Sequence, residues 1–125
     1  MSAYQFLVVD DEPSVGRAIK LILKSDGHDV QTVPSGNAAL ALLEHRQFDL
    51  IITDYAMDGM QGDELASRIK QLRPDQAIIM VTAFADDFNI HGKSSGGAAC
   101  VLLKPFSIAA LKEAIARILP TKKPN

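Results

Sequence analysis

The chain has 125 residues, a formal net charge of −2, and 47% hydrophobic against 22% charged residues, so it can form one domain with a sizeable core. This charge balance excludes the basic footprint of a nucleic-acid-binding domain, and no apolar run approaches the roughly 20 residues of a membrane span. We expect no signal peptide, because the first residues lack a basic and an apolar region. The single cysteine, Cys100, excludes an internal disulfide, and we expect a cytoplasmic protein.

In chain order, short apolar runs alternate with helical patterns. The runs at 6–10, 50–54, 77–82 and 100–104 are almost continuously apolar, which is typical of strands that are buried on both faces. The run at 28–33 is more mixed in composition and indicates an edge strand. The sequence therefore predicts five strands.

The intervals between these strands carry apolar residues at helical spacing. Pro13 fits the start of the first helix and Gly27 its end, and Ser35 and Ser107 are candidate N-caps of the second and last helices. A further helix near 86–95 has a poor pattern, because glycines and serines interrupt it. The apolar stripes are Val15, Ala18, Ile19, Ile22 and Leu23 in the first helix, Ala39, Leu42 and Leu43 in the second, Leu65, Ile69 and Leu72 in the third, and Leu111, Ile115, Ile118 and Leu119 in the last.

Repetition of strand and helix predicts an α/β sandwich around one parallel sheet. We predict one domain over residues 1–119, followed by a polar tail or the start of a linker at 120–125, because Pro120 stops the last helix. Ligands of such sheets bind beyond the carboxyl ends of the strands. The polar groups expected at those ends are Asp10 and Asp11 after the first strand, Asp54 after the third, Thr82 after the fourth and Lys104 after the fifth.

These side chains suit phosphoryl transfer to a carboxylate. Carboxylates gathered in one pocket repel one another and resist ionisation. Their hard oxygen ligands suit Mg²⁺, whose charge would offset this repulsion. Lys104 offsets further negative charge, and the Thr82 hydroxyl can donate to an anionic oxygen. Phosphoryl transfer depends on such charge neutralisation and positioning. We therefore predict that Asp54 is a nucleophile that becomes an aspartyl phosphate.

Four motifs in this order and spacing resemble the receiver domain of two-component response regulators, the CheY-like family. The motifs are "VVDDE" at 8–12, "TDYAMDG" at 53–59, "VTA" at 81–83 and "LLKPF" at 102–106. The resemblance extends over nearly the whole chain. It implies a flavodoxin-like (βα)5 fold, with a parallel five-stranded sheet of order 2-1-3-4-5.

The resemblance also implies roles for individual residues. Asp54 would be the phosphoacceptor. Asp11, Asp54 and the Ala56 carbonyl would bind Mg²⁺ directly, and Asp10 would reach the ion mainly through water.

The phosphoryl oxygens would be bound by Thr82 and Lys104, with help from backbone N–H groups near Ala56 and Ala83. The Lys104–Pro105 peptide bond would be cis. The phosphoryl group would come from a histidine of a sensor histidine kinase or a histidine phosphotransfer domain. Downstream, the resemblance implies an effector protein or a fused output domain, with no direct nucleic-acid binding by this domain and no membrane contact.

The sequence departs from the family pattern at four places. Asp58 replaces a frequent proline and adds an acid near the site. Val101 occupies a position that usually carries an aromatic switch residue, so the readout of phosphorylation should differ. Ala56 and Phe84 offer no hydrogen bond to a hydrolytic water, which predicts a slowly hydrolysing phosphoaspartate. The segment 86–97 should be short, mobile or partly unwound, and we expect it to become ordered on phosphorylation or partner binding.

Two other functions are compatible with parts of the pattern. A degenerate receiver would act through constitutive protein contacts, which the intact acids and Lys104 disfavour. An aspartyl-nucleophile phosphatase of the haloacid dehalogenase type would need a second acid two residues after the nucleophile, where this chain has Ala56. The leading hypothesis is thus a phosphorylation switch that is not a turnover enzyme, although it would assist its own phosphorylation and dephosphorylation.

Overall fold

A computed structural model of the chain describes residues 3–83 and 97–120. Within these ranges, five parallel strands form one sheet of order β2-β1-β3-β4-β5. The strands are β1 (Gln5–Val9), β2 (Asp29–Val33), β3 (Leu50–Asp54), β4 (Ala77–Thr82) and β5 (Cys100–Leu103). The predicted flavodoxin-like topology, with the mixed strand at the edge, is therefore confirmed.

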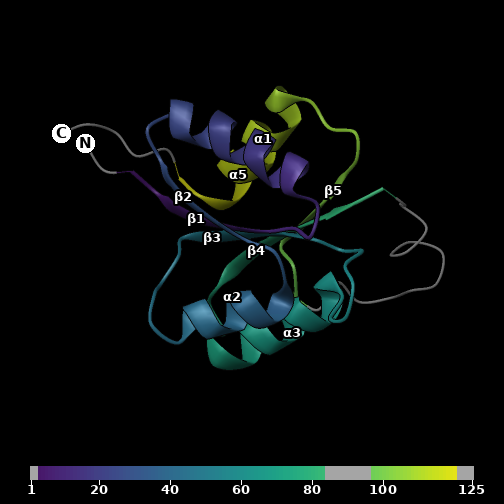
Figure 1. Cartoon of the computed structure of the whole chain (residues 1–125). Coiled ribbons are helices and arrows are strands. Elements are labelled where there is room, and N and C mark those ends of the chain that lie inside the picture. Colours follow the sequence, from purple (N-terminus) through teal and green to yellow (C-terminus); the bar gives the residue numbers. More distant parts are fainter. Residues whose placement is uncertain (1–2, 84–96, 121–125) are drawn as a thin grey trace.

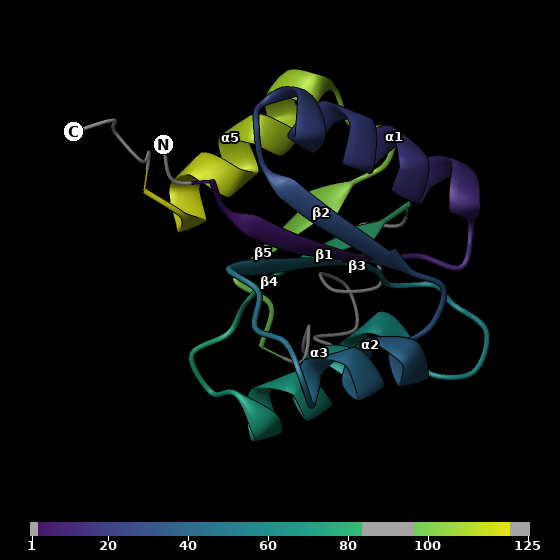
Figure 2. The same ribbon diagram turned by 60° about the vertical axis from the view of Figure 1, so that its left-hand side comes forward.

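Helices α1 (Pro13–Ser25) and α5 (Ile108–Ile118) cover one face of the sheet, and α2 (Gly36–Leu43) and α3 (Gly62–Leu72) cover the other (Figures 1 and 2). The fourth helix expected near 86–95 lies outside the described residues. None of the described helices is long and apolar enough to cross a membrane.

The core is divided by the sheet into two layers, because successive side chains of a strand point to opposite faces. Leu7, Val9 and Ile51 pack toward α2 and α3. Phe6 and Val8 pack toward α1 and α5. The central strands are buried on both sides, which explains their nearly continuous apolar sequence.

The predicted helix boundaries are largely confirmed. Pro13 opens α1, and Gly27 follows its end with a φ of 88°, a conformation that favours glycine. The hydroxyls of Ser35 and Ser107 accept hydrogen bonds from the backbone N–H groups of Ala38 and Ala110, as N-caps do.

Two apolar positions differ from expectation. Leu72, in the last turn of α3, is 60% exposed. At this end of α3 the contact with the neighbouring segment is polar, because the Arg73 guanidinium donates to the carbonyls of Leu43 and Arg46. Leu119 lies just past α5 with extended backbone, although its side chain still packs on the core.

Gly62, the first residue of α3, lies in close contact with the end of β3. A Cβ atom placed there would lie 2.4 Å from the Asp54 carbonyl oxygen and 2.6 Å from the Met80 sulfur, whereas a Cβ at the buried helical Gly16 would meet only a Thr32 methyl at 4.0 Å. We therefore expect Gly62→Ala to lower the free energy of unfolding by about 1–3 kcal/mol through overpacking.

The matched control, Gly16→Ala, should raise the free energy of unfolding by up to about 1 kcal/mol, because alanine is the better helix former. Urea unfolding followed by circular dichroism measures both variants. Equal effects of the two substitutions would show that the close approach at Gly62 carries no energetic weight.

Candidate functional site

Three carboxylates meet at the carboxyl-terminal edge of the sheet. Asp10 and Asp11 directly follow β1, and Asp54 is the last residue of β3. One oxygen from each of the three lies within 4.8 Å of the others. The parallel pairing of β1 with β3 brings them together, since both strands end at the same edge. The structure thus places these predicted site residues in one cluster.

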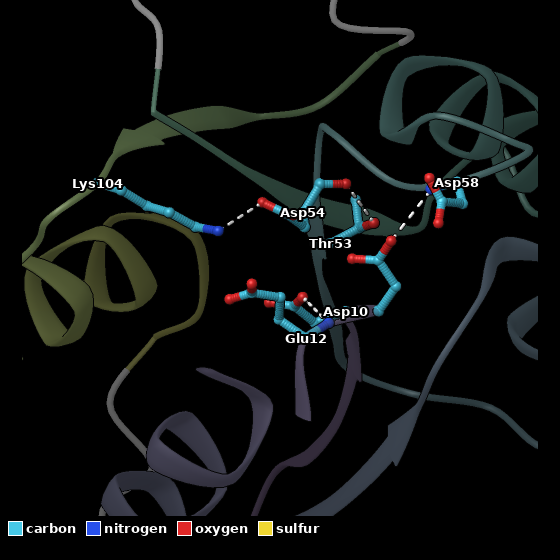
Figure 3. Close-up of polar contacts among 7 residues, drawn as sticks. Asp10, Glu12, Thr53, Asp54, Asp58 and Lys104 are labelled. Atoms are coloured by element: carbon cyan, nitrogen blue, oxygen red, sulfur yellow. Dashed lines mark hydrogen bonds and ion pairs between the residues drawn. The ribbon is translucent and has the colours of Figure 1, made fainter. Parts of the chain in front are cut away.

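Lys104 completes the cluster from the other side of Asp54. Its Nζ lies 2.9 Å from Asp54 Oδ1, with side-chain exposures of 26% for Lys104 and 8% for Asp54. Figure 3 shows the lysine reaching across to the Asp54 carboxylate, opposite Asp58. The Lys104 backbone N–H donates to the Thr82 carbonyl at 2.8 Å, which holds the ends of β4 and β5 side by side. The Lys104–Pro105 peptide bond is cis.

Backbone N–H groups hold the two acids that follow β1. The Glu12 N–H donates to Asp10 Oδ1 at 2.7 Å, and the Asp58 N–H donates to Asp11 Oδ2 at 3.1 Å (Figure 3). The second bond ties the β3–α3 loop to the start of α1. The Asp58 side chain is exposed, so at this position the main chain makes the contact with the cluster.

Burial raises the pKa of the Asp10 carboxyl above its ordinary value, and the charges of Asp54 and Asp11 raise it further. The Glu12 N–H bond and the Lys104 charge act in the opposite direction without cancelling the increase. The ionised form of Asp10 is therefore less favourable in the folded protein than in the unfolded chain, as expected for a buried carboxylate beside other acids.

Of the remaining predicted residues, the structure describes Thr82, Ala83, Ala56 and Val101. Thr82 ends β4 and is buried, while Ala83 and Ala56 are exposed beyond the strand ends. Val101 is half-buried in β5 and packs on the core layer beneath α2 and α3. Phe84 and most of the segment 86–97 lie outside the described residues.

Sequence reasoning missed one buried polar group beside the site. Thr53 is fully buried, and its Oγ1 donates to the Asp54 carbonyl at 3.0 Å (Figure 3). The available signal was a hydroxyl in the apolar stretch "LIIT", directly before the candidate nucleophile.

The donor set fits a small divalent cation. Three carboxylates supply hard oxygen ligands of the kind that Mg²⁺ binds, usually with one or two carboxylates and several waters. A cation would also offset the burial and the repulsion that together raise the pKa of Asp10. Asp10, Asp11 and Asp54 are therefore the residues that could hold Mg²⁺.

A doubly wound parallel sheet with an acidic, lysine-paired cluster at its carboxyl edge defines the class of CheY-like α/β proteins. A family model described as "Response regulator receiver domain" matches residues 6–116. The chain belongs to this family, whose members act as signalling switches in two-component systems.

Relatives contain this domain alone or within longer proteins. The chain is 33% identical over 120 residues to the chemotaxis protein CheY-3 of Vibrio cholerae. The matched region covers 91% of this chain and 90% of CheY-3. It is 33% identical over 118 residues to the transcriptional regulatory protein GlrR of Escherichia coli. Here the matched region covers 94% of this chain and 27% of GlrR. The chain thus spans about a quarter of the length of GlrR.

Solved structures share the fold. The response regulator TrrA of Thermotoga maritima, in complex with Mg²⁺-BeF, matches with a TM-score of 0.84 and 32% identity over 93% of this chain and 99% of TrrA. The receiver domain of a sensor histidine kinase of Pseudomonas aeruginosa, with a magnesium ion in its active site cleft, matches with a TM-score of 0.82 and 26% identity over 94% of this chain and 98% of that domain.

Asp10→Asn should stabilise the metal-free protein at neutral pH. The amide oxygen can still accept the Glu12 N–H bond, while the unfavourable charge is removed. Because the folded pKa of Asp10 is raised, the penalty is absent below the ordinary value of 3.8 and fully present above the raised folded pKa.

Urea unfolding between pH 4 and pH 7 tests this expectation. The advantage of the Asn variant should grow as the pH rises through the folded pKa, and saturating Mg²⁺ should stabilise the wild type more than the variant. An Asn variant that is less stable than the metal-free wild type at pH 7 would contradict it.

Proposed function

We propose that this receiver domain is a phosphorylation-dependent switch in which Asp54 accepts a phosphoryl group from a histidine of a sensor histidine kinase or a histidine phosphotransfer domain. One observation carries the proposal. The Asp54 carboxylate is paired with the Lys104 ammonium at 2.9 Å and lies within 4.8 Å of oxygens from Asp10 and Asp11. A nucleophilic carboxylate thus has a cation on one side and the ligands for a metal on the other.

Mg²⁺ is the proposed cofactor, held directly by Asp11, Asp54 and the Ala56 carbonyl and by Asp10 through water. When bound, it neutralises charge on the carboxylates and on the incoming phosphoryl group. Its ligands come from two chain segments that the Asp58 N–H bond to Asp11 already joins. The metal site therefore needs little rearrangement of the protein.

In the transfer step, an Asp54 oxygen forms a bond to phosphorus while the bond from phosphorus to the partner's histidine nitrogen breaks. The electron pair of that bond stays on the imidazole nitrogen, which takes up a proton. Lys104 moves its ion pair from Asp54 to a phosphoryl oxygen. Thr82 and the Ala83 N–H, at the end of β4, bind further phosphoryl oxygens.

The output is carried by a downstream effector protein or a fused output domain. We assign residues 1–119 to the receiver domain and 120–125 to a tail or linker. The domain acts in the cytoplasm, without direct contact with nucleic acid or membrane. Because Val101 presents no ring that could turn inward, Thr82 and Lys104 transmit the phosphorylated state in a different way from relatives with an aromatic residue at this position.

The first test is phosphorylation by acetyl phosphate, with and without Mg²⁺, followed by intact mass spectrometry. We expect one added phosphoryl group that requires Mg²⁺ and is absent from Asp54→Ala. Mg²⁺ binding without transfer would restrict the donor to a protein histidine. If the protein shows no Mg²⁺ binding and no transfer, the proposal is overturned in favour of a receiver that acts through fixed protein contacts.

Replacement of Lys104 should separate metal binding from transfer. Lys104→Met removes the cation that competes for Asp54, so Mg²⁺ should bind roughly tenfold more tightly. Phosphorylation should nevertheless become slower, because the ammonium no longer neutralises a phosphoryl oxygen.

Titration calorimetry with MgCl2 and the phosphorylation assay measure the two effects. Lys112, exposed on α5 and paired with Asp26, provides the control variant Lys112→Met, which should change neither quantity. Weaker Mg²⁺ binding by Lys104→Met would show that the lysine supports the metal site instead of competing with it.

A further inference from the structure

We infer that Thr53 is a positioning residue for the phosphoacceptor, an inference that rests on the proposed function. Thr53 is fully buried on the face of the sheet that α3 covers, in register with Met80 of β4. Its hydroxyl donates to the carbonyl of Asp54 at 3.0 Å. The side chain itself does not reach the reacting carboxylate, so it acts through the backbone of Asp54.

The Asp54 carbonyl lies where the pairing of β1 with β3 has ended. That pairing stops at Val9 and Thr53. On the other side, the Tyr55 N–H donates to the Val81 carbonyl at 2.8 Å. A trans peptide directs its C=O opposite to its N–H, so the Asp54 carbonyl points away from β4. The Thr53 hydroxyl supplies a bond where the strand ladder offers none.

Gly62 confines the same carbonyl from the side of α3. A Cβ at this position would lie 2.4 Å from the Asp54 oxygen, so only glycine allows the contact. The Gly62 N–H also donates to the Tyr55 carbonyl at 2.8 Å. The peptide after Asp54 is therefore held at its N–H by β4 and at its C=O by Thr53, and the next carbonyl is held by α3.

This restraint sets the direction in which the Asp54 side chain leaves the backbone. The carboxylate must meet Lys104 on one side and the Asp10–Asp11 pair on the other. The carbonyl of Ala56, a proposed metal ligand, lies only two peptides later. Since reacting groups must be held to within a fraction of an ångström, loss of the hydroxyl should weaken Mg²⁺ binding and slow phosphoryl transfer.

Two substitutions separate positioning from packing. Thr53→Val keeps the shape and removes the hydroxyl, whereas Thr53→Ser keeps the hydroxyl and loses a buried methyl. We expect Thr53→Val to have an Mg²⁺ affinity and a rate of phosphorylation by acetyl phosphate that are each about 3- to 10-fold lower than in the wild type. This is the effect of losing one buried hydrogen bond. Thr53→Ser should stay within about twofold of the wild type in both assays, although it unfolds at lower urea.

Ile79→Val is the control for stability alone, because Ile79 is buried on the opposite face of the sheet, toward α1 and α5. It should lower the unfolding midpoint and leave the Mg²⁺ affinity unchanged. If Thr53→Val does not fold, Thr53→Ala compared with Thr53→Ser isolates the hydroxyl in the same way.

The inference would be overturned if Thr53→Val had the wild-type Mg²⁺ affinity and phosphorylation rate, or if both quantities followed stability across all variants. Either result would leave the proposed function intact. A wild type that neither binds Mg²⁺ nor accepts phosphate would overturn the proposed function, and this inference with it.

Discussion

The burial and crowding of carboxylates at one sheet edge, where Asp10, Asp11 and Asp54 meet, is the constraint on which the site depends. Their oxygens lie within 4.8 Å of one another, and Asp10 and Asp54 are largely buried. Such a cluster is costly unless cations and hydrogen-bond donors compensate for it. Lys104 and the N–H groups of Glu12 and Asp58 provide partial compensation. The remaining concentration of carboxylate oxygens is the feature of the site that fits a divalent cation.

The rest of the fold stabilises this unfavourable arrangement. Central strands that are buried on both faces supply apolar contacts on either side of the sheet, which offset the cost of the acids at its edge. The close packing of α3 on the end of β3, possible because residue 62 is glycine, restrains the backbone of Asp54. Stability and site geometry therefore depend on some of the same contacts.

The relatives contain this domain either as nearly the whole protein or as one part of a longer protein. CheY-3 corresponds to this chain over 90% of its length, whereas GlrR does so over 27%. The acidic cluster and Lys104 are contained within one sheet edge and require no further domain to assemble. Val101 lies on the α2 and α3 side of β5, half-buried and packed on the core.

The sequence by itself determined the order of the strands and helices that the structure describes, the two serine caps and the identity of the clustered residues. Apolar periodicity and capping are local properties, and the rule that parallel strands end at one edge converts order along the chain into proximity. Only the tertiary structure decided the exposure of Leu72, the extended backbone at Leu119, the Asp58 N–H bond to Asp11 and the bond from the Thr53 hydroxyl to the Asp54 carbonyl. The exposure of Leu72, the bond to Asp11 and the burial of Thr53 depend on how separate segments pack against one another, which no local pattern specifies.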